Sequence, residues 1–207
     1  MGFPIGIQLY SLREKTQKDF LGTLEKVAQI GYQGVEFAGY GGILASQMKE
    51  HLDRLGLKAI SSHVPLERLE NYIDEEISYA KQLEMPYIVC PWATFENMED
   101  IDRIAKILDI AGQKCFEAGI TLLYHNHDHE FKTIDDKYIL DILFEKTNPQ
   151  NVKAQLDLCW VSKGGVDEVE YVQKYKGRCP ILHAKDYIVE PKFRQVEVGT
   201  GIVNFKG

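Results

Sequence analysis

The chain has 207 residues, a net charge of −7 and a pI of about 5.4, and 44% of its residues are hydrophobic. These values are typical of an ordinary soluble globular protein. No cluster of Lys and Arg stands out against the negative charge, which argues against nucleic-acid binding. No apolar run approaches the ~20 residues of a membrane span, and no secretory signal is visible, so we expect no membrane partner.

The cysteines are scattered and show no CxxC spacing; they are Cys90, Cys115, Cys159 and Cys179. This distribution predicts neither a zinc knuckle nor a redox motif. We expect reduced, mostly buried thiols in a cytoplasmic protein.

One pattern repeats along the chain: an amphipathic stretch ends near a glycine or a turn, and a short apolar run follows. In chain order the expected elements are a strand at 5–9, a helix at 20–28, a strand at 34–37, a helix at 44–55, a strand at 59–63, a helix at 66–80, a strand at 87–90, a helix at 101–111, a strand at 120–125, a helix at 139–143, a strand at 154–157, a helix at 169–175 and a strand at 181–184.

Strands that alternate with helices predict a parallel sheet, either doubly wound or closed as a (β/α)8 barrel. The segment Gly39-Tyr40-Gly41-Gly42 does not match the GxGxxG pattern that a dinucleotide-binding sheet requires. Polar or aromatic residues end nearly every expected strand, and they are Gln8, Glu36, His63, Trp92, His125, Asp157 and His183. Because a barrel brings such ends together on one face, we predict a single TIM-barrel domain over residues 1–207.

The number of expected units is one short of a complete barrel. A (β/α)8 barrel has eight units and typically about 250 residues. Here the sequence ends at Gly207, after the seventh unit. We therefore expect a barrel that lacks its final βα unit. The unpaired strand edges of such a barrel predict self-association into a homo-oligomer.

Three consecutive expected strands end in groups that bind metal ions. The stretch Tyr124–Glu130 holds three histidines and two carboxylates, Asp157 lies in an otherwise apolar strand, and His183 ends the seventh strand. Neighbouring strands of a barrel place these groups close together. We predict that Glu130, Asp157 and His183 bind one divalent cation, with Mn²⁺, Mg²⁺ or Co²⁺ favoured and Zn²⁺ as an alternative.

Each of these residues also has a structural interpretation. Asp157 could pair with Lys185 or cap a loop, and His183 could be a hydrogen-bonded core histidine. His63 could contact a ligand or fill the polar layer at the barrel mouth. Trp160 could pack against a sugar ring or within the core.

Several segments resemble one known family, and they are Gln8–Arg13, Gly34–Phe37, Tyr124–Phe131, Gln155–Trp160, Leu182–Asp186 and Val198–Val203. They look like the xylose-isomerase-like TIM barrels, the sugar phosphate isomerase/epimerase superfamily. That superfamily includes ketose 3-epimerases, hydroxypyruvate isomerase and inosose dehydratase. The resemblance covers essentially the whole chain.

The resemblance implies a divalent-metal-dependent sugar or sugar-phosphate isomerase or epimerase that removes a proton next to a carbonyl through an enediolate. It supports the three metal ligands already named. The remaining implied roles are acid or base for Glu130 and Lys185, and substrate contacts for His63, His127, Trp160 and Lys185. Two departures stand out: the further Glu of the family's eighth strand lies beyond this sequence, and Tyr124 stands about where sugar epimerases often carry a Glu.

Three alternatives remain open. The first is a lyase similar to inosose dehydratase, which would lose a β-hydroxyl after the same proton abstraction. The second is a nuclease similar to endonuclease IV, although the acidic pI argues against it. The third is an inactive sugar-binding protein, which would retain affinity for sugars without turnover.

Overall fold

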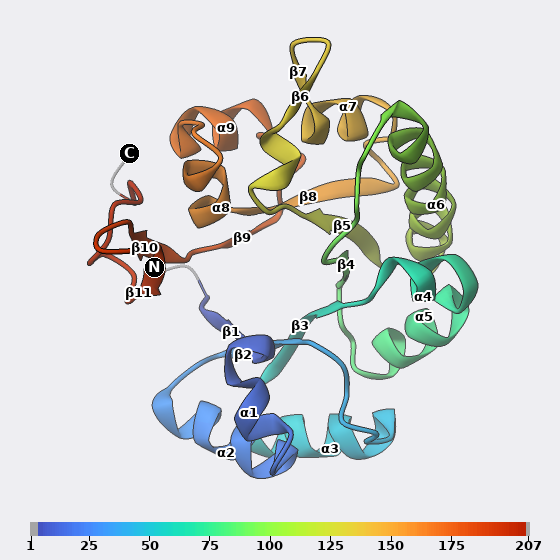
Figure 1. Ribbon diagram of the computed structural model, residues 1–207. Coiled ribbons are helices and arrows are strands. Elements are labelled where there is room, and N and C mark those ends of the chain that lie inside the picture. The colour runs from blue at the N-terminus through green and yellow to red at the C-terminus, as the bar shows by residue number, and fades with distance from the viewer. Residues whose placement is uncertain (1–3, 206–207) are drawn as a thin grey trace.

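The computed structural model describes residues 4–205. Seven parallel strands form one sheet in the order β1-β2-β3-β4-β5-β8-β9, and Figure 1 shows this sheet curving around a central axis with the helices outside it. The strands are β1 (Gly6–Gln8), β2 (Gly34–Phe37), β3 (Lys58–His63), β4 (Tyr87–Cys90), β5 (Thr121–His125), β8 (Val152–Asp157) and β9 (Ile181–His183). Every strand expected from the sequence is present. β1 and β9 form the two edges of the sheet. The predicted self-association would occur through these edges.

The helices begin and end largely where the sequence signals place them. They are η1 (Leu9–Leu12), α1 (Arg13–Thr16), α2 (Phe20–Ile30), α3 (Ala45–Leu55), α4 (Leu66–Asn71), α5 (Ile73–Gln82), α6 (Met98–Glu117), η2 (His129–Phe131), α7 (Ile139–Glu145), α8 (Leu158–Lys163) and α9 (Glu168–Lys174). Gly31 and Gly56 adopt the left-handed conformation that ends α2 and α3. The stripe expected as one helix over 66–80 is divided at Tyr72, whose φ of −136° leaves the helical region.

The core lies between the sheet and the inner faces of the helices. Val35, Ile88, Leu122 and Leu156 from four different strands are completely buried. The expected reduced thiols are confirmed: all four cysteines are free, and three of them are buried. No helix within residues 4–205 combines the length and apolar character needed to cross a membrane.

Polar side chains collect at the C-terminal ends of the strands, as the sequence predicts. Gln8, His63, His125, Asp157 and His183 are each the last residue of their strand. Glu36, which is next to last in β2, pairs in register with Gln8, and Asp157 pairs with His183. The parallel arrangement therefore brings the polar ends of distant segments to one face.

Two small hairpins were not expected from the sequence. β6 (Thr133–Ile134) and β7 (Lys137–Tyr138) are joined by Asp135 and Asp136, both of which have positive φ angles of 49° and 61°. Such angles are those of the tight turn that joins two antiparallel strands. After the sheet, β10 (Asp186–Ile188) pairs antiparallel with β11 (Arg194–Val196).

Asp186 organises the segment that follows β11. Its buried carboxylate accepts hydrogen bonds from the backbone N–H groups of Tyr187 at 2.9 Å, Gly199 at 2.9 Å, Gly201 at 2.8 Å and Val203 at 3.0 Å. A Cβ atom at Gly201 would lie 2.3 Å from Asp186 Oδ1, so the close approach requires glycine there. Burial opposes ionisation, but the backbone donors outweigh it and lower the pKa of Asp186.

We predict that Asp186→Asn releases this segment and lowers the free energy of unfolding by about 2–3 kcal/mol, the value of hydrogen bonds to a charged group. Because the folded-state pKa of Asp186 is lowered, its contribution is complete above the unfolded-state value of about 3.9 and is lost as the pH falls through the folded-state value. Hydrogen exchange at Gly199, Gly201 and Val203 measures the effect. Protection that is unchanged in the variant would contradict it.

Candidate metal centre

Asp157 lies at the junction of β8 and α8, and its two carboxylate oxygens have different partners. Oδ1 caps α8 by accepting hydrogen bonds from the backbone N–H groups of Cys159 at 3.1 Å and Trp160 at 3.4 Å. The backbone N–H of Asp157 donates to Asn126 Oδ1 at 3.0 Å. The sequence alternative of a capping role is therefore correct for one oxygen, and it leaves the other oxygen for a second role.

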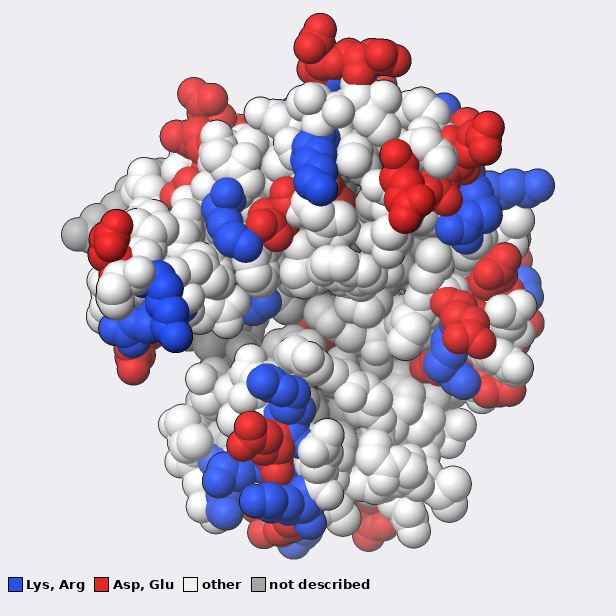
Figure 2. All heavy atoms as spheres, viewed as in Figure 1, with Lys and Arg blue, Asp and Glu red and all other residues white. Residues whose placement is uncertain are grey.

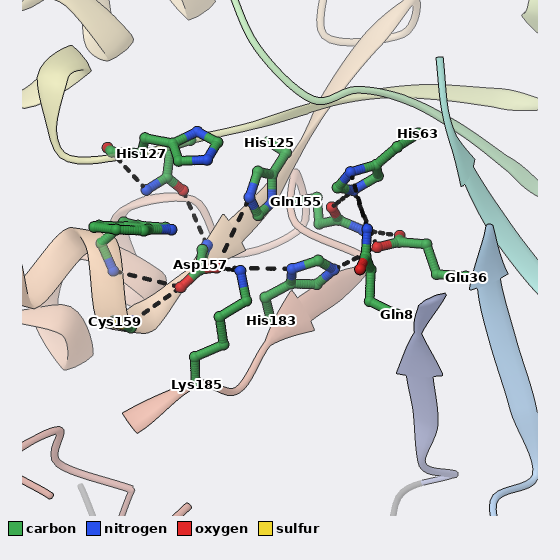
Figure 3. Close-up of polar contacts among 12 residues, drawn as sticks. Gln8, Glu36, His63, His125, His127, Gln155, Asp157, Cys159, His183 and Lys185 are labelled. Atoms are coloured by element: carbon green, nitrogen blue, oxygen red, sulfur yellow. Dashed lines mark hydrogen bonds and ion pairs between the residues drawn. The ribbon is translucent and has the colours of Figure 1, made fainter. Parts of the chain in front are cut away.

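Oδ2 of Asp157 points into the barrel mouth, where three nitrogen groups surround it (Figure 3). Lys185 Nζ is 2.7 Å away, His183 Nδ1 is 3.7 Å away and His125 Nε2 is 3.8 Å away. The two imidazole distances are too long for hydrogen bonds. They are close to the ~3–3.5 Å that separates two ligands of one metal ion when each metal–ligand bond is ~2.0–2.2 Å.

An unused polar atom marks the same place. His183 Nδ1 is buried and has no hydrogen-bond partner in the part of the chain that the structure describes, and the same holds for His125 Nδ1, the ring nitrogen opposite the Nε2 that approaches Asp157. His63, His125 and His183 also offer one nitrogen each within 4.8 Å of one another. Buried polar atoms without partners are costly unless a ligand or ion satisfies them. The donor set of carboxylate and imidazole therefore fits a divalent cation.

Behind His183 lies the buried carboxylate of Glu36. Glu36 Oε1 accepts from His183 Nε2 at 2.6 Å and lies 3.0 Å from His63 Nε2. Its Oε2 accepts from Ser61 Oγ and from Gln155 Nε2, both at 2.5 Å. This network joins β2, β3, β8 and β9 across the barrel, as Figure 3 shows for the labelled residues.

The charges of this cluster are strongly coupled. Burial raises the pKa of Glu36, but the adjacent His183 and His63 hold it well below its usual range. Burial lowers the pKa of His183, and Glu36 together with Asp157 reverses that effect and raises it to about 9. Burial and the neighbouring positive groups, His183 first among them, place the pKa of His125 well below its usual value, so that its imidazole is uncharged.

Glu130 does not join Asp157 and His183 in the structure, contrary to its predicted place in the metal site. Its fully buried carboxylate accepts from Tyr124 OH at 2.7 Å and from the backbone N–H of His127 at 2.8 Å. Oε2 also lies 3.3 Å from His129 Nδ1. Glu130 lies in η2, in the loop after β5, and there its carboxylate is held by Tyr124 and by the backbone of His127.

The predicted substrate contacts divide into two groups. His63 belongs to the Glu36 network and also meets Gln155 Oε1 at 3.0 Å. His127 and Trp160 lie together, with ring centroids 5.4 Å apart. Trp160 Nε1 and His127 Nδ1 are buried without partners among the described residues. Lys185 is 30% exposed, so that its ammonium group is accessible from the barrel mouth.

Two residues of this centre were missed or undervalued from the sequence. His125 was recognised only as part of the polar stretch and as a strand end, and Glu36 only as one of the residues that end the expected strands. Adjacent residues of a strand point to opposite faces, so Tyr124 and His125 must differ in direction. Tyr124 OH donates to Glu130, whereas His125 Nε2 lies 3.8 Å from Asp157 Oδ2.

Comparisons with known proteins agree with this architecture. A family model described as "Xylose isomerase-like TIM barrel" matches residues 24–207. The structure of a sugar phosphate isomerase/epimerase from Parabacteroides distasonis ATCC 8503 is 28% identical, with a TM-score of 0.83 over 99% of this chain and 84% of that chain. The predicted barrel fold is thus confirmed.

Two further relatives are more distant. An inosose dehydratase from Geobacillus kaustophilus (strain HTA426) is 24% identical over 188 residues; the match covers 79% of this chain and 60% of the length of that relative. The IOLI protein, whose structure contains a zinc atom, is 15% identical, with a TM-score of 0.78 over 98% of this chain and 81% of that chain.

Proposed function

We propose that this chain, which belongs to the xylose isomerase-like TIM barrel family, acts as a divalent-metal-dependent isomerase or epimerase of a sugar or sugar phosphate. One observation carries the proposal: Asp157 Oδ2 and the unpartnered Nδ1 of His183 lie 3.7 Å apart at the mouth of the barrel. The sugar phosphate isomerase/epimerase of Parabacteroides distasonis has the same fold and is 28% identical to this chain, which supports the proposal.

Asp157, His183 and His125 are the residues that would hold the cation, with His125 in the place first predicted for Glu130. The IOLI protein, which has a similar fold, binds zinc. Mn²⁺, Co²⁺ and Zn²⁺ all accept a mixed carboxylate and imidazole set, and Mg²⁺ prefers more oxygen. When bound, a divalent ion supplies a Lewis acid that polarises the carbonyl of the substrate.

The chain's own side chains would perform the remaining steps. The ammonium group of Lys185 can donate a hydrogen bond to the substrate oxygen on which negative charge develops. Burial and Lys185 lower the pKa of His127 to about 4, so its imidazole is uncharged at neutral pH. We assign to His127 Nδ1 the uptake of the proton next to the carbonyl. Return of a proton to the same carbon from the opposite face gives an epimer, and return to the neighbouring carbon gives an isomer.

Glu130 takes a supporting role in this proposal. Its contacts with Tyr124 OH at 2.7 Å and His127 N at 2.8 Å fix the loop that carries His127. To act as a metal ligand or as an acid or base, as predicted from the sequence, Glu130 would have to give up both of these hydrogen bonds. Trp160 offers an aromatic surface and a free N–H beside His127, a combination suited to a sugar ring.

A dehydratase is the second candidate, and the match to an inosose dehydratase over 79% of this chain favours it. The first step would be the same proton abstraction. A hydroxyl on the β-carbon would then leave as water, with Lys185 as the proton donor. The C–O bond breaks, the electron pair of the former C–H bond forms the new double bond, and no oxidant is needed.

Metal analysis and solvent exchange test both candidates. The purified chain would be stripped with a chelator and reloaded with Mn²⁺, Co²⁺, Mg²⁺ or Zn²⁺, and ketoses and inososes would then be incubated with it in D₂O. Deuterium at the carbon next to the carbonyl without net loss of water supports isomerisation or epimerisation, whereas an absorbing enone product supports the dehydratase. No exchange with any substrate would reject the proposed proton abstraction, and cleavage of abasic DNA would favour the nuclease.

A further inference from the structure

The ring nitrogen of His183 that faces away from Asp157, Nε2, also has a partner that fixes its position. His183 Nε2 lies 2.6 Å from Glu36 Oε1, across the barrel from β9 to β2. An ionised carboxylate can only accept hydrogen bonds, so Nε2 must carry the hydrogen. A metal ion binds the neutral imidazole, and in that form Nδ1, which faces Asp157 Oδ2 at 3.7 Å, is the nitrogen that carries the lone pair.

The orientation of Glu36 is itself fixed by its other partners. Ser61 Oγ and Gln155 Nε2 both donate to Oε2 at 2.5 Å, while Oε1 remains for the two imidazoles. The side-chain carbonyl oxygen of Gln155 lies 3.0 Å from His63 Nε2, within hydrogen-bond distance. With donors around both oxygens, the carboxylate can be neither rotated nor protonated without losing a hydrogen bond.

We propose that Glu36 is a positioning residue that fixes the ring and the tautomer of His183, so that Nδ1 rather than Nε2 binds the divalent cation. This inference rests on the proposed function, because it concerns the same cation. A carboxylate that orients a metal-binding imidazole through its other ring nitrogen is a general device, and loss of such a partner typically weakens metal affinity by about 10–100-fold.

Glu36→Gln tests the proposal, because glutamine keeps the size of the side chain and introduces an N–H₂ group. If that group faces His183, Nε2 must accept a hydrogen bond and the hydrogen moves to Nδ1. If it faces Ser61 and Gln155 instead, donors meet donors and the side chain loses its fixed orientation. In either case we expect the dissociation constant for Co²⁺ or Mn²⁺, measured by calorimetry, to rise by about 10–100-fold.

A matched control separates positioning from stability. Glu76 is also buried and accepts hydrogen bonds from Arg68 Nε at 2.5 Å and Tyr40 OH at 3.1 Å, in a network apart from the barrel mouth. Glu76→Gln should lower the thermal stability of the metal-free chain and leave the Co²⁺ dissociation constant unchanged. If Glu36→Gln behaves in the same way, Glu36 is structural and the proposal is overturned.

A measurement on the unmodified chain does not depend on whether the variants fold. With Zn²⁺ bound, long-range ¹H–¹⁵N NMR of the histidine side chains should show an Nε2–H and a metal-bound Nδ1 for His183. Binding through Nε2 would overturn the role of Glu36 but leave the proposed function in place. No uptake of Co²⁺, Mn²⁺ or Zn²⁺ by the wild-type chain would overturn both.

Discussion

Asp157→Asn is expected to abolish divalent-metal binding while leaving α8 in place. Oδ1 accepts from the N–H groups of Cys159 and Trp160, and the oxygen of asparagine can keep both of these capping bonds. The amide N–H₂ then stands where Oδ2 stands in the wild-type chain, facing Lys185 Nζ at 2.7 Å. A neutral donor at that position cannot bind a cation. We expect the dissociation constant for Co²⁺ or Mn²⁺ to rise by more than about 100-fold, because even residues behind the ligands cost 10–100-fold.

Calorimetric titration with Co²⁺ measures this loss, and circular dichroism verifies that the variant is folded. Asp141→Asn provides the control. Asp141 is also a buried aspartate, and its carboxylate accepts from Tyr171 OH at 2.8 Å, Tyr175 OH at 2.6 Å and Lys174 Nζ at 2.6 Å. That change should reduce stability and leave the metal affinity intact. Wild-type affinity in Asp157→Asn would exclude Asp157 as a ligand.

The sequence predicts the barrel well because its signals are periodic and local. The recurring step from an amphipathic helix to a short apolar strand depends on residue spacing, and glycines such as Gly31 and Gly56 mark the helix ends directly. The polar ends of the strands follow from the same pattern. The hairpin of β10 and β11 shows no such periodicity. The segment after it depends on hydrogen bonds from the backbone N–H groups of Gly199, Gly201 and Val203 to Asp186, which residue spacing does not reveal.

The cluster of side chains at the barrel mouth was predicted only in part, and the difference is one of side-chain direction. Asp157 and His183 end adjacent strands that are in register, so their proximity follows from the fold. Glu130 lies in the loop after β5, where spacing does not determine orientation, and its carboxylate turns toward Tyr124. Glu36 meets His183 from 147 positions away in the sequence, a contact that the curvature of the open sheet creates.

The face of the molecule shown in Figure 2 carries charges of both signs. On the face shown in Figure 2, Lys and Arg side chains are interspersed with Asp and Glu rather than gathered into a basic patch. Charged side chains also form ion pairs, such as Lys49 with Asp53 at 2.7 Å and Lys137 with Glu145 at 2.8 Å. Such pairs near the surface contribute little to stability.

Lys185→Met is expected to lose turnover and to keep metal binding, whereas Asp157→Asn is expected to lose metal binding itself. Methionine preserves much of the apolar stem and removes the ammonium group, which lies 2.7 Å from Asp157 Oδ2. Without that positive neighbour, Asp157 attracts a cation at least as strongly as before, so the dissociation constant for Co²⁺ should stay the same or fall. Because removal of one donor to a developing oxyanion typically costs ~10²–10³ in kcat, we expect a loss of that size in the rate of solvent exchange.

The two measurements must be made on the same preparation, since their divergence is the informative result. Lys174→Met makes the same chemical change at another lysine–aspartate ion pair, where Lys174 Nζ lies 2.6 Å from Asp141 Oδ2. It should leave both the exchange rate and the metal affinity at wild-type values. If Lys185→Met lost metal and activity together, Lys185 would act by supporting the geometry of Asp157. Full activity in the variant would remove Lys185 from the reaction, and stabilisation of the developing charge would then fall to the cation and the imidazoles alone.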